Sequence, residues 1–269
     1  MEPTPYEAAP YEAAPYEPGT PCWLDLASAD PAASRRFYGG LFGWTSYTLT
    51  IDTLDDYDVF TLGGVNGPTV AGMQRLTDPS QPSVWTCYFY AESVEEAARR
   101  VVAAGGRELL PPTEIAHLGR TGMYSDLEGW DFAVWQPHEV EGADVVGRPA
   151  AMCWTELAAY EAEPAESFYG AVFGWDAVRH GDRTTWRAGR RPVAGLIPMD
   201  DKRPGGWIPF FQVADCDAAV RDGVELGARV AVPPRDEAAG RFAAVVDPNG
   251  AWVTMIAPHG VGEGLPESG

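Results

Sequence analysis

The stretch PCWLDLASADPAASRRFYGGLFGW (21–44) returns later in the chain as AMCWTELAAYEAEPAESFYGAVFGW (151–175). A second match follows in the same order, from ELLPPTEIAHLGRTGMYSDLEGWDFAVWQPH (108–138) to VAVPPRDEAAGRFAAVVDPNGAWVTMIAPH (230–259). Ordered similarity over such lengths indicates an internal duplication. We therefore predict two homologous halves, each long enough to form one domain.

Each half also contains two copies of a smaller unit. In the first half, 22–28 has the pattern of a strand, and Asp30-Pro31 supplies the N-cap and first-turn proline of a helix that glycine ends after about Leu41. The pattern restarts with a strand at 84–91 and a helix that Ser93 opens. The other strands of this half are expected at 44–50, 57–62, 69–75, 107–110, 120–126 and 131–136. The predicted fold class is α+β, with four βαβββ modules forming two tandem cup-shaped barrels.

The chain is predicted to divide into two domains and three connecting or terminal segments. Residues 1–20 repeat PYEAA, PYEAA and PYEPG, and proline at this frequency blocks helix and sheet, so a disordered tail is expected. The expected segments are a first domain at 21–140, a linker at 141–150, a second domain at 151–260 and a flexible tail at 261–269.

Composition excludes several classes of function. The net charge of −20 repels phosphate backbones, so we expect no nucleic-acid partner. No apolar run reaches the roughly 18 residues of a membrane span, and the first residues lack the features of a secretory signal. None of the four cysteines forms a C-x-x-C pair, which argues against structural zinc and for reduced thiols. A cytoplasmic protein, monomeric or homodimeric, is expected.

Three motifs in this pattern resemble the vicinal oxygen chelate superfamily of glyoxalases, bleomycin-resistance proteins and extradiol dioxygenases. The first is the opening strand and helix that end in Phe-Tyr-Gly-x-x-Phe-Gly-Trp, at 37–44 and 168–175. The second is the strand followed by a helix that opens the second module of each half, with the helix beginning at Ser93 and Asp215. The third is the terminal turn Asp-Pro-Asn-Gly (247–250), with a variant at 126–129. The two-halved form is similar to actinobacterial glyoxalase-like or hydroxylase-like proteins, which implies a role in secondary metabolism.

Enzymes of that superfamily commonly hold a divalent metal inside the cup. The resemblance implies a histidine seven residues before the helix-capping residue and a glutamate four residues after the glycine of the terminal turn. The matching positions here carry Trp23, Thr86, Trp154, Ile208, Ala133 and Thr254. Since a metal needs several oxygen or nitrogen donors that converge on one point, we predict no metal and no cofactor.

Strand alternation places one set of side chains on the concave face of each cup. The candidate catalytic residues are Asp25, Glu156 and Tyr88, because a carboxylate in an aromatic cup has a raised pKa and suits acid–base chemistry. Either carboxylate could instead face water or pair with an arginine. The candidate ligand-binding residues are Trp23, Thr86, Tyr90, Ala133 and Trp135 in the first half, and Trp154, Phe210, Gln212 and Thr254 in the second. Any one of these aromatic side chains could instead simply fill the barrel.

Three functions remain open at this level. The first is metal-independent binding of a hydrophobic aromatic small molecule, such as a secondary metabolite, including sequestration of an antibiotic. The second is a cofactor-free acid–base enzyme, of lyase, isomerase or hydroxylase-like type, that acts on such a molecule. The third is a divalent-metal-dependent glyoxalase or dioxygenase with displaced ligands, for example His117 converging with Asp25.

Overall fold

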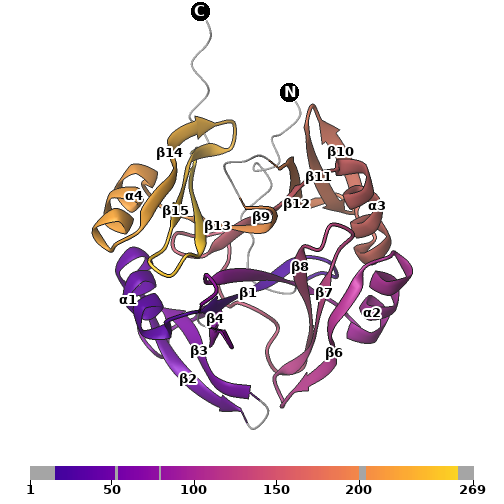
Figure 1. The fold of residues 1–269 in the computed structure, drawn as a ribbon, viewed down its shortest axis with the longest axis horizontal. Coiled ribbons are helices and arrows are strands. Elements are labelled where there is room, and N and C mark those ends of the chain that lie inside the picture. Colours follow the sequence, from indigo (N-terminus) through magenta and orange to yellow (C-terminus); the bar gives the residue numbers. More distant parts are fainter. Residues whose placement is uncertain (1–15, 52–53, 79, 200–203, 260–269) are drawn as a thin grey trace, which may run out of the picture.

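A computed structural model describes residues 16–51, 54–78, 80–199 and 204–259. Its described part contains two eight-stranded sheets and four helices, and each domain contributes one sheet and two helices. The four βαβββ modules predicted from the repeats are confirmed. In Figure 1, the first domain lies in the lower half of the view and the second in the upper half.

The elements follow the repeat closely. In the first domain they are β1 (Pro21–Ser28), α1 (Pro31–Phe42), β2 (Trp44–Ile51), β3 (Leu54–Leu62), β4 (Thr69–Arg75), β5 (Val84–Tyr90), α2 (Val94–Ala103), β6 (Arg107–Ile115), β7 (Gly119–Ser125) and β8 (Asp131–Pro137). In the second domain they are β9 (Met152–Ala159), α3 (Ala162–Phe173), β10 (Asp176–His180), β11 (Arg183–Ala188), β12 (Arg191–Pro198), β13 (Gly206–Gln212), α4 (Cys216–Glu225), β14 (Arg229–Glu237), β15 (Gly240–Val246) and β16 (Trp252–Pro258).

Strand order is the same in both domains. The first sheet runs β2-β3-β4-β1-β5-β8-β7-β6, and the second runs β10-β11-β12-β9-β13-β16-β15-β14. The two modules of a domain meet at the antiparallel pairs β1–β5 and β9–β13, while β4 and β12 run parallel to β1 and β9. The opening strand of each module therefore lies near the centre of its sheet.

The first helix begins and ends where the sequence predicts. The Asp30 carboxylate accepts hydrogen bonds from the backbone N–H groups of Ala32 and Ala33, at 3.0 and 3.1 Å. Gly43 ends the helix in the left-handed conformation, with φ of 70°, which glycine adopts without steric cost.

The Phe-Tyr-Gly-x-x-Phe-Gly-Trp motif builds the core between the two domains. Tyr38, Phe42 and Trp44 pack with Trp85 and with Phe211 of the other domain. The repeat-equivalent residues Tyr169, Phe173 and Trp175 pack in the same way with Trp207 and Phe89. Large buried aromatic side chains contribute much of the hydrophobic stabilisation of a core. The motif thus joins the domains and lies away from the cups.

Two hydrogen-bonded chains cross the domain boundary. The Tyr38 hydroxyl donates to Asp247 at 3.0 Å and accepts from the Trp85 indole at 3.1 Å. Its counterpart, Tyr169, donates to Asp126 at 3.0 Å and accepts from the Trp207 indole at 2.9 Å. Helix α1 accordingly packs beside α4, and α2 beside α3, as Figure 1 shows.

The segment just before β1 packs on the first domain, although a disordered tail was expected through residue 20. Tyr16 is only 8% exposed, and its hydroxyl donates to the carbonyl of Ala143 at 2.7 Å. Its ring stacks on Tyr90, with the centroids 6.4 Å apart. The first domain therefore includes residues 16–20. The remainder of the expected N-terminal tail and the C-terminal tail lie outside the described residues.

Within the described ranges, no helix combines the length and apolar character needed to span a bilayer.

Candidate functional site

Each sheet has one face covered by helices and one face without them. In β1, Leu24 and Leu26 belong to the core under the helices, so Trp23 and Asp25 occupy the opposite face. We call the helix-free face of the first sheet the first cup, and that of the second sheet the second cup. Trp154 and Glu156 face the second cup in the same way.

The sequence-predicted residues of the first half share the first cup. Thr86 pairs with Asp25, and Tyr88 pairs with Trp23 on one side and Ala133 on the other. These side chains therefore form two adjacent rows across the middle of the sheet. Ala133 is fully buried, whereas Trp23, Thr86 and Tyr88 are each partly exposed.

Asp25 is a buried carboxylate at the centre of the first cup. The residue is 3% exposed, and its Oδ1 has no hydrogen-bond partner among the described residues. Burial raises the pKa of Asp25 to about 7, against an ordinary value of 3.8, and hydrogen bonding from Tyr57 lowers it in part. Asp25 can therefore exchange a proton near neutral pH.

Tyr57, on β3, was not among the residues predicted from the sequence. Its hydroxyl accepts a hydrogen bond from the Trp23 indole at 3.0 Å and lies beside Asp25. The tyrosine reaches this place over Gly72, where a Cβ atom would lie 1.7 Å from the hydroxyl oxygen and 2.8 Å from Asp25 Oδ1. Burial, followed by the nearby Asp25 carboxylate, raises the pKa of Tyr57. It therefore acts as a neutral hydrogen-bonding group.

Tyr88 is the second hydroxyl near Asp25. Burial raises its pKa, and the Asp25 carboxylate adds to the effect. A tyrosine with a raised pKa stays protonated and donates a hydrogen bond more readily than it removes a proton. Tyr88 is thus a neutral hydroxyl near Asp25 that can donate a hydrogen bond.

Tyr90 and Trp135 lie at the rim of the first cup, where other parts of the chain contact them. Tyr16 covers the Tyr90 ring, and the Trp135 indole donates to the carbonyl of Val140 at 2.7 Å. Both side chains keep partial exposure. These contacts indicate that Tyr90 and Trp135 stabilise the rim of the cup. The sequence did not indicate this structural role.

The second cup is filled with apolar side chains. Trp154 and Ile256 are 6% and 3% exposed, and Phe210 and Phe242 pack against them. Ile208, which takes the place of Thr86, is also buried at 5% exposure. Thr254 is 3% exposed, and its hydroxyl accepts from the Trp252 indole at 2.9 Å. Gln212 and Glu156 are the partly exposed polar side chains among the predicted residues of this cup.

Glu156 pairs with an arginine, one of the alternatives left open by the sequence. Nη1 of Arg183 lies 3.8 Å from Oε1 of Glu156, whose side chain is 14% exposed. Gly195 pairs with Glu156 as Gly72 pairs with Asp25, so a glycine faces the carboxylate in both cups. The two cups thus share a framework and differ in the group that faces the carboxylate.

The residues of the cups do not fit a divalent metal. The positions named by the family pattern carry indole, methyl and hydroxyl groups, and among the described residues no three His, Cys, Asp or Glu side chains gather closely enough to bind a metal ion. His117 is exposed and lies 3.8 Å from Glu139, and His138 contacts Glu114 at 2.7 Å. Neither histidine is paired with the buried Asp25.

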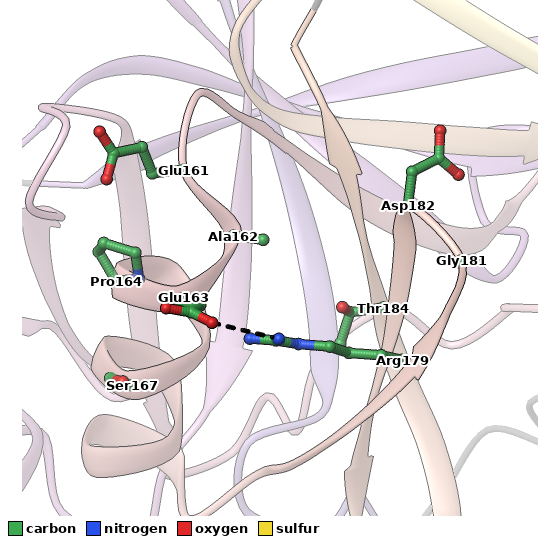
Figure 2. Close-up of a pocket in the computed structure, with 9 residues that line it drawn as sticks. All are labelled: Glu161, Ala162, Glu163, Pro164, Ser167, Arg179, Gly181, Asp182 and Thr184. Atoms are coloured by element: carbon green, nitrogen blue, oxygen red, sulfur yellow. Dashed lines mark hydrogen bonds and ion pairs between the residues drawn. The ribbon is translucent and has the colours of Figure 1, made fainter.

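A surface cavity of about 530 Å³ lies outside both cups, beside the N-terminus of α3. Figure 2 shows Arg179 extending across it towards Glu163. The Arg179 guanidinium binds Glu163 of the cavity lining at 3.3 Å and Glu166, outside the lining, at 2.6 Å, so its charge is compensated by carboxylates of α3. Nothing in the sequence analysis indicated this cavity.

Models of two related families match the two halves. The description "Glyoxalase-like domain" covers residues 23–135, and "Glyoxalase/Bleomycin resistance protein/Dioxygenase superfamily" covers residues 152–255. The chain is 36% identical over 257 residues to the anthracycline biosynthesis protein DnrV of Streptomyces peucetius, covering 89% of this chain and 93% of that protein. It is 30% identical over 248 residues to the putative glyoxylase CFP32 of Mycobacterium bovis, covering 89% and 95%.

Solved structures share the fold at low sequence identity. The Mn(II)-bound glyoxalase from Novosphingobium aromaticivorans has a TM-score of 0.61 at 16% identity, covering 89% of this chain and 82% of that one. The 2,3-dioxygenase LapB from Pseudomonas sp. KL28 has a TM-score of 0.61 at 11% identity, covering 94% and 97%.

Proposed function

Since the chain belongs to the glyoxalase, bleomycin resistance protein and dioxygenase superfamily, we propose that its first cup binds a hydrophobic aromatic small molecule without a divalent metal. We further propose that Asp25 exchanges a proton with this ligand. The observation that carries the proposal is Asp25 itself, a buried carboxylate with an unpartnered oxygen among the described residues. It lies opposite Thr86 and next to the cross-strand pair of Trp23 and Tyr88.

The surroundings of Asp25 suit a planar ligand that carries oxygen atoms. Trp23 and Tyr88 offer ring faces for stacking, and the hydroxyls of Tyr88 and Thr86 offer hydrogen bonds to a carbonyl or phenol. Relatives at 35–36% identity are named anthracycline biosynthesis proteins, and anthracyclines are planar, hydroxylated aromatic molecules. The ligand class proposed for this chain is therefore an aromatic secondary metabolite.

Exposure favours the first cup over the second. Trp23, Thr86 and Trp135 are partly exposed, whereas their counterparts Trp154, Ile208 and Ile256 are buried. The side chains of the first set keep some solvent exposure, so this cup is the less tightly packed of the two at these positions.

The reaction that Asp25 supports without a co-reactant is a proton transfer within the ligand. The ionised carboxylate removes a proton from an acidic carbon that is conjugated through the ring with a carbonyl, and the resulting acid returns the proton at the oxygen or at another carbon. Atoms and charge balance, and the net change is an isomerisation. A pKa of about 7 lets one group perform both steps at neutral pH.

Binding is tested with 1,4-dihydroxyanthraquinone, followed through the visible absorption of the probe. We expect Trp23→Phe to weaken binding about tenfold and the matched variant Trp154→Phe to change it less than about twofold. Equal losses of affinity in both variants would contradict the choice of the first cup. No binding by the wild-type chain would contradict the ligand class.

Proton exchange is tested with anthrone, an aromatic ketone with an acidic methylene group. The wild-type chain is expected to accelerate deuterium incorporation from heavy water, and Asp25→Asn to abolish the acceleration.

Elemental analysis of the protein, purified without chelators and then exposed to Mn²⁺, Fe²⁺, Zn²⁺ or Ni²⁺, provides the metal test. Near-stoichiometric metal would overturn metal independence.

A further inference from the structure

One position in the repeat decides which chemical group faces the carboxylate of each cup. Val59 pairs with Gly72 in the first sheet, and Thr185 pairs with Gly195 in the second. Tyr57 lies two residues before Val59, and Arg183 lies two residues before Thr185. These two residues therefore occupy the same place in the two copies of the module.

Their interactions correspond as well. Tyr57 lies over Gly72 beside Asp25 and accepts the Trp23 indole hydrogen bond at 3.0 Å. Arg183 lies 3.8 Å from Glu156, the carboxylate that pairs with Gly195. The duplicated framework is therefore the same, but a neutral hydroxyl has been exchanged for a cation.

This exchange changes what each carboxylate can do. A guanidinium beside a carboxylate favours the ionised form of the carboxylate, and Arg183 lies 3.8 Å from Glu156. A hydroxyl hydrogen-bonds to the carboxylate and adds no charge, so the carboxyl group keeps its ability to gain and lose a proton near neutral pH. Because the Trp23 indole already donates to the Tyr57 oxygen, the hydroxyl proton itself is directed to another acceptor.

We propose that Tyr57 is the positioning and specificity-determining residue of the first cup, and that the tyrosine-to-arginine exchange at this position separates a ligand-binding cup from a structural one. This inference rests on the proposed function. The pair of Tyr57 and Asp25 selects a neutral aromatic ligand with a carbonyl or phenolic oxygen. The pair of Arg183 and Glu156 closes the second cup with internally matched charges, beside the apolar cluster of Trp154, Phe210 and Ile256.

The test compares Tyr57→Phe, Tyr57→Arg and the matched variant Arg183→Gln. Neutral 1,4-dihydroxyanthraquinone and anionic anthraquinone-2-carboxylate serve as probes, and thermal unfolding checks that each variant is folded. Tyr57→Phe is expected to weaken binding of the neutral probe about tenfold, as one buried hydrogen bond implies. Tyr57→Arg should reverse the preference toward the anionic probe. Arg183→Gln should leave both affinities within about twofold.

The pH dependence of binding distinguishes positioning from mere packing. Tyr57 and Tyr88 are the titratable groups that face Asp25, from β3 and β5. Because Tyr57 favours the ionised carboxylate, its replacement by phenylalanine should move the midpoint of the binding profile to higher pH, whereas Arg183→Gln should not move it.

Two negative results have different meanings. If the wild-type chain binds neither probe, the proposed function fails and the inference fails with it. If the wild-type chain binds the neutral probe, but Tyr57→Phe binds it equally well with an unchanged pH midpoint, only the inference is overturned.

Discussion

Replacement of Asp25 by asparagine tests the electrostatic description of the first cup directly. In the folded protein the pKa of Asp25 is about 7 because the residue is buried, whereas the ordinary value, expected in the unfolded chain, is 3.8. Each pKa unit corresponds to about 1.4 kcal/mol of differential interaction, so ionised Asp25 destabilises the fold by up to about 4 kcal/mol. This is a large share of the roughly 5–15 kcal/mol that stabilises a typical domain.

The direction of the pH effect follows from which state binds the proton. Between pH 3.8 and about 7 the unfolded chain has lost the Asp25 proton while the folded chain keeps it, so the free energy of unfolding falls as the pH rises. Below that window neither state is ionised at Asp25, and above it the full penalty persists. Asparagine has nearly the same shape and never ionises.

We therefore expect Asp25→Asn to exceed the wild-type free energy of unfolding by up to about 4 kcal/mol near pH 8.5, and by about zero near pH 4. Urea unfolding, followed by tryptophan fluorescence at several pH values, measures the difference between the two proteins. The matched variant Glu156→Gln removes a carboxylate that Arg183 partners and should show no such gain. A difference in the free energy of unfolding between Asp25→Asn and wild type that stays constant with pH would refute the reasoning.

Three further predictions concern packing. Tyr169→Phe removes the hydroxyl that donates to buried Asp126 and accepts from a tryptophan, and it should lower the free energy of unfolding by about 1–3 kcal/mol in urea titrations. Gly72→Ala places a Cβ atom 1.7 Å from the Tyr57 hydroxyl, so the tyrosine must move, and affinity for 1,4-dihydroxyanthraquinone should fall at least as much as in Tyr57→Phe. All four cysteines are buried free thiols whose pKa values are raised chiefly by burial where a shift is resolved, so a thiol reagent should label none in the native protein and all four in urea.

The variant Tyr38→Phe is the internal control for Tyr169→Phe. It removes the repeat-equivalent hydrogen bond to Asp247 and should lower the free energy of unfolding by a similar amount. An unchanged stability in both variants would show that the cross-domain chains contribute nothing. Labelling of a native cysteine at the rate of an exposed thiol would contradict the burial of that residue.

The sequence alone determined the architecture of this protein. The offset between Phe37 and Phe168 reveals the duplication, and the alternation in β1 and β5 assigns Trp23, Asp25 and Tyr88 to one face. These inferences succeed because side-chain direction along a strand depends on local backbone geometry, which the residue pattern records. The same local logic located the helix start at Asp30.

Only the tertiary structure decided which groups surround each carboxylate. Tyr57 lies 32 positions from Asp25 in the chain and reaches it only because Gly72, on the strand between them, has no side chain. The contact of Arg183 with Glu156 and the bond from Tyr38 to Asp247 likewise join strands and domains that are distant in sequence. Such contacts depend on strand order, register and the free space above a glycine, and these quantities exist only after the sheets have formed and packed.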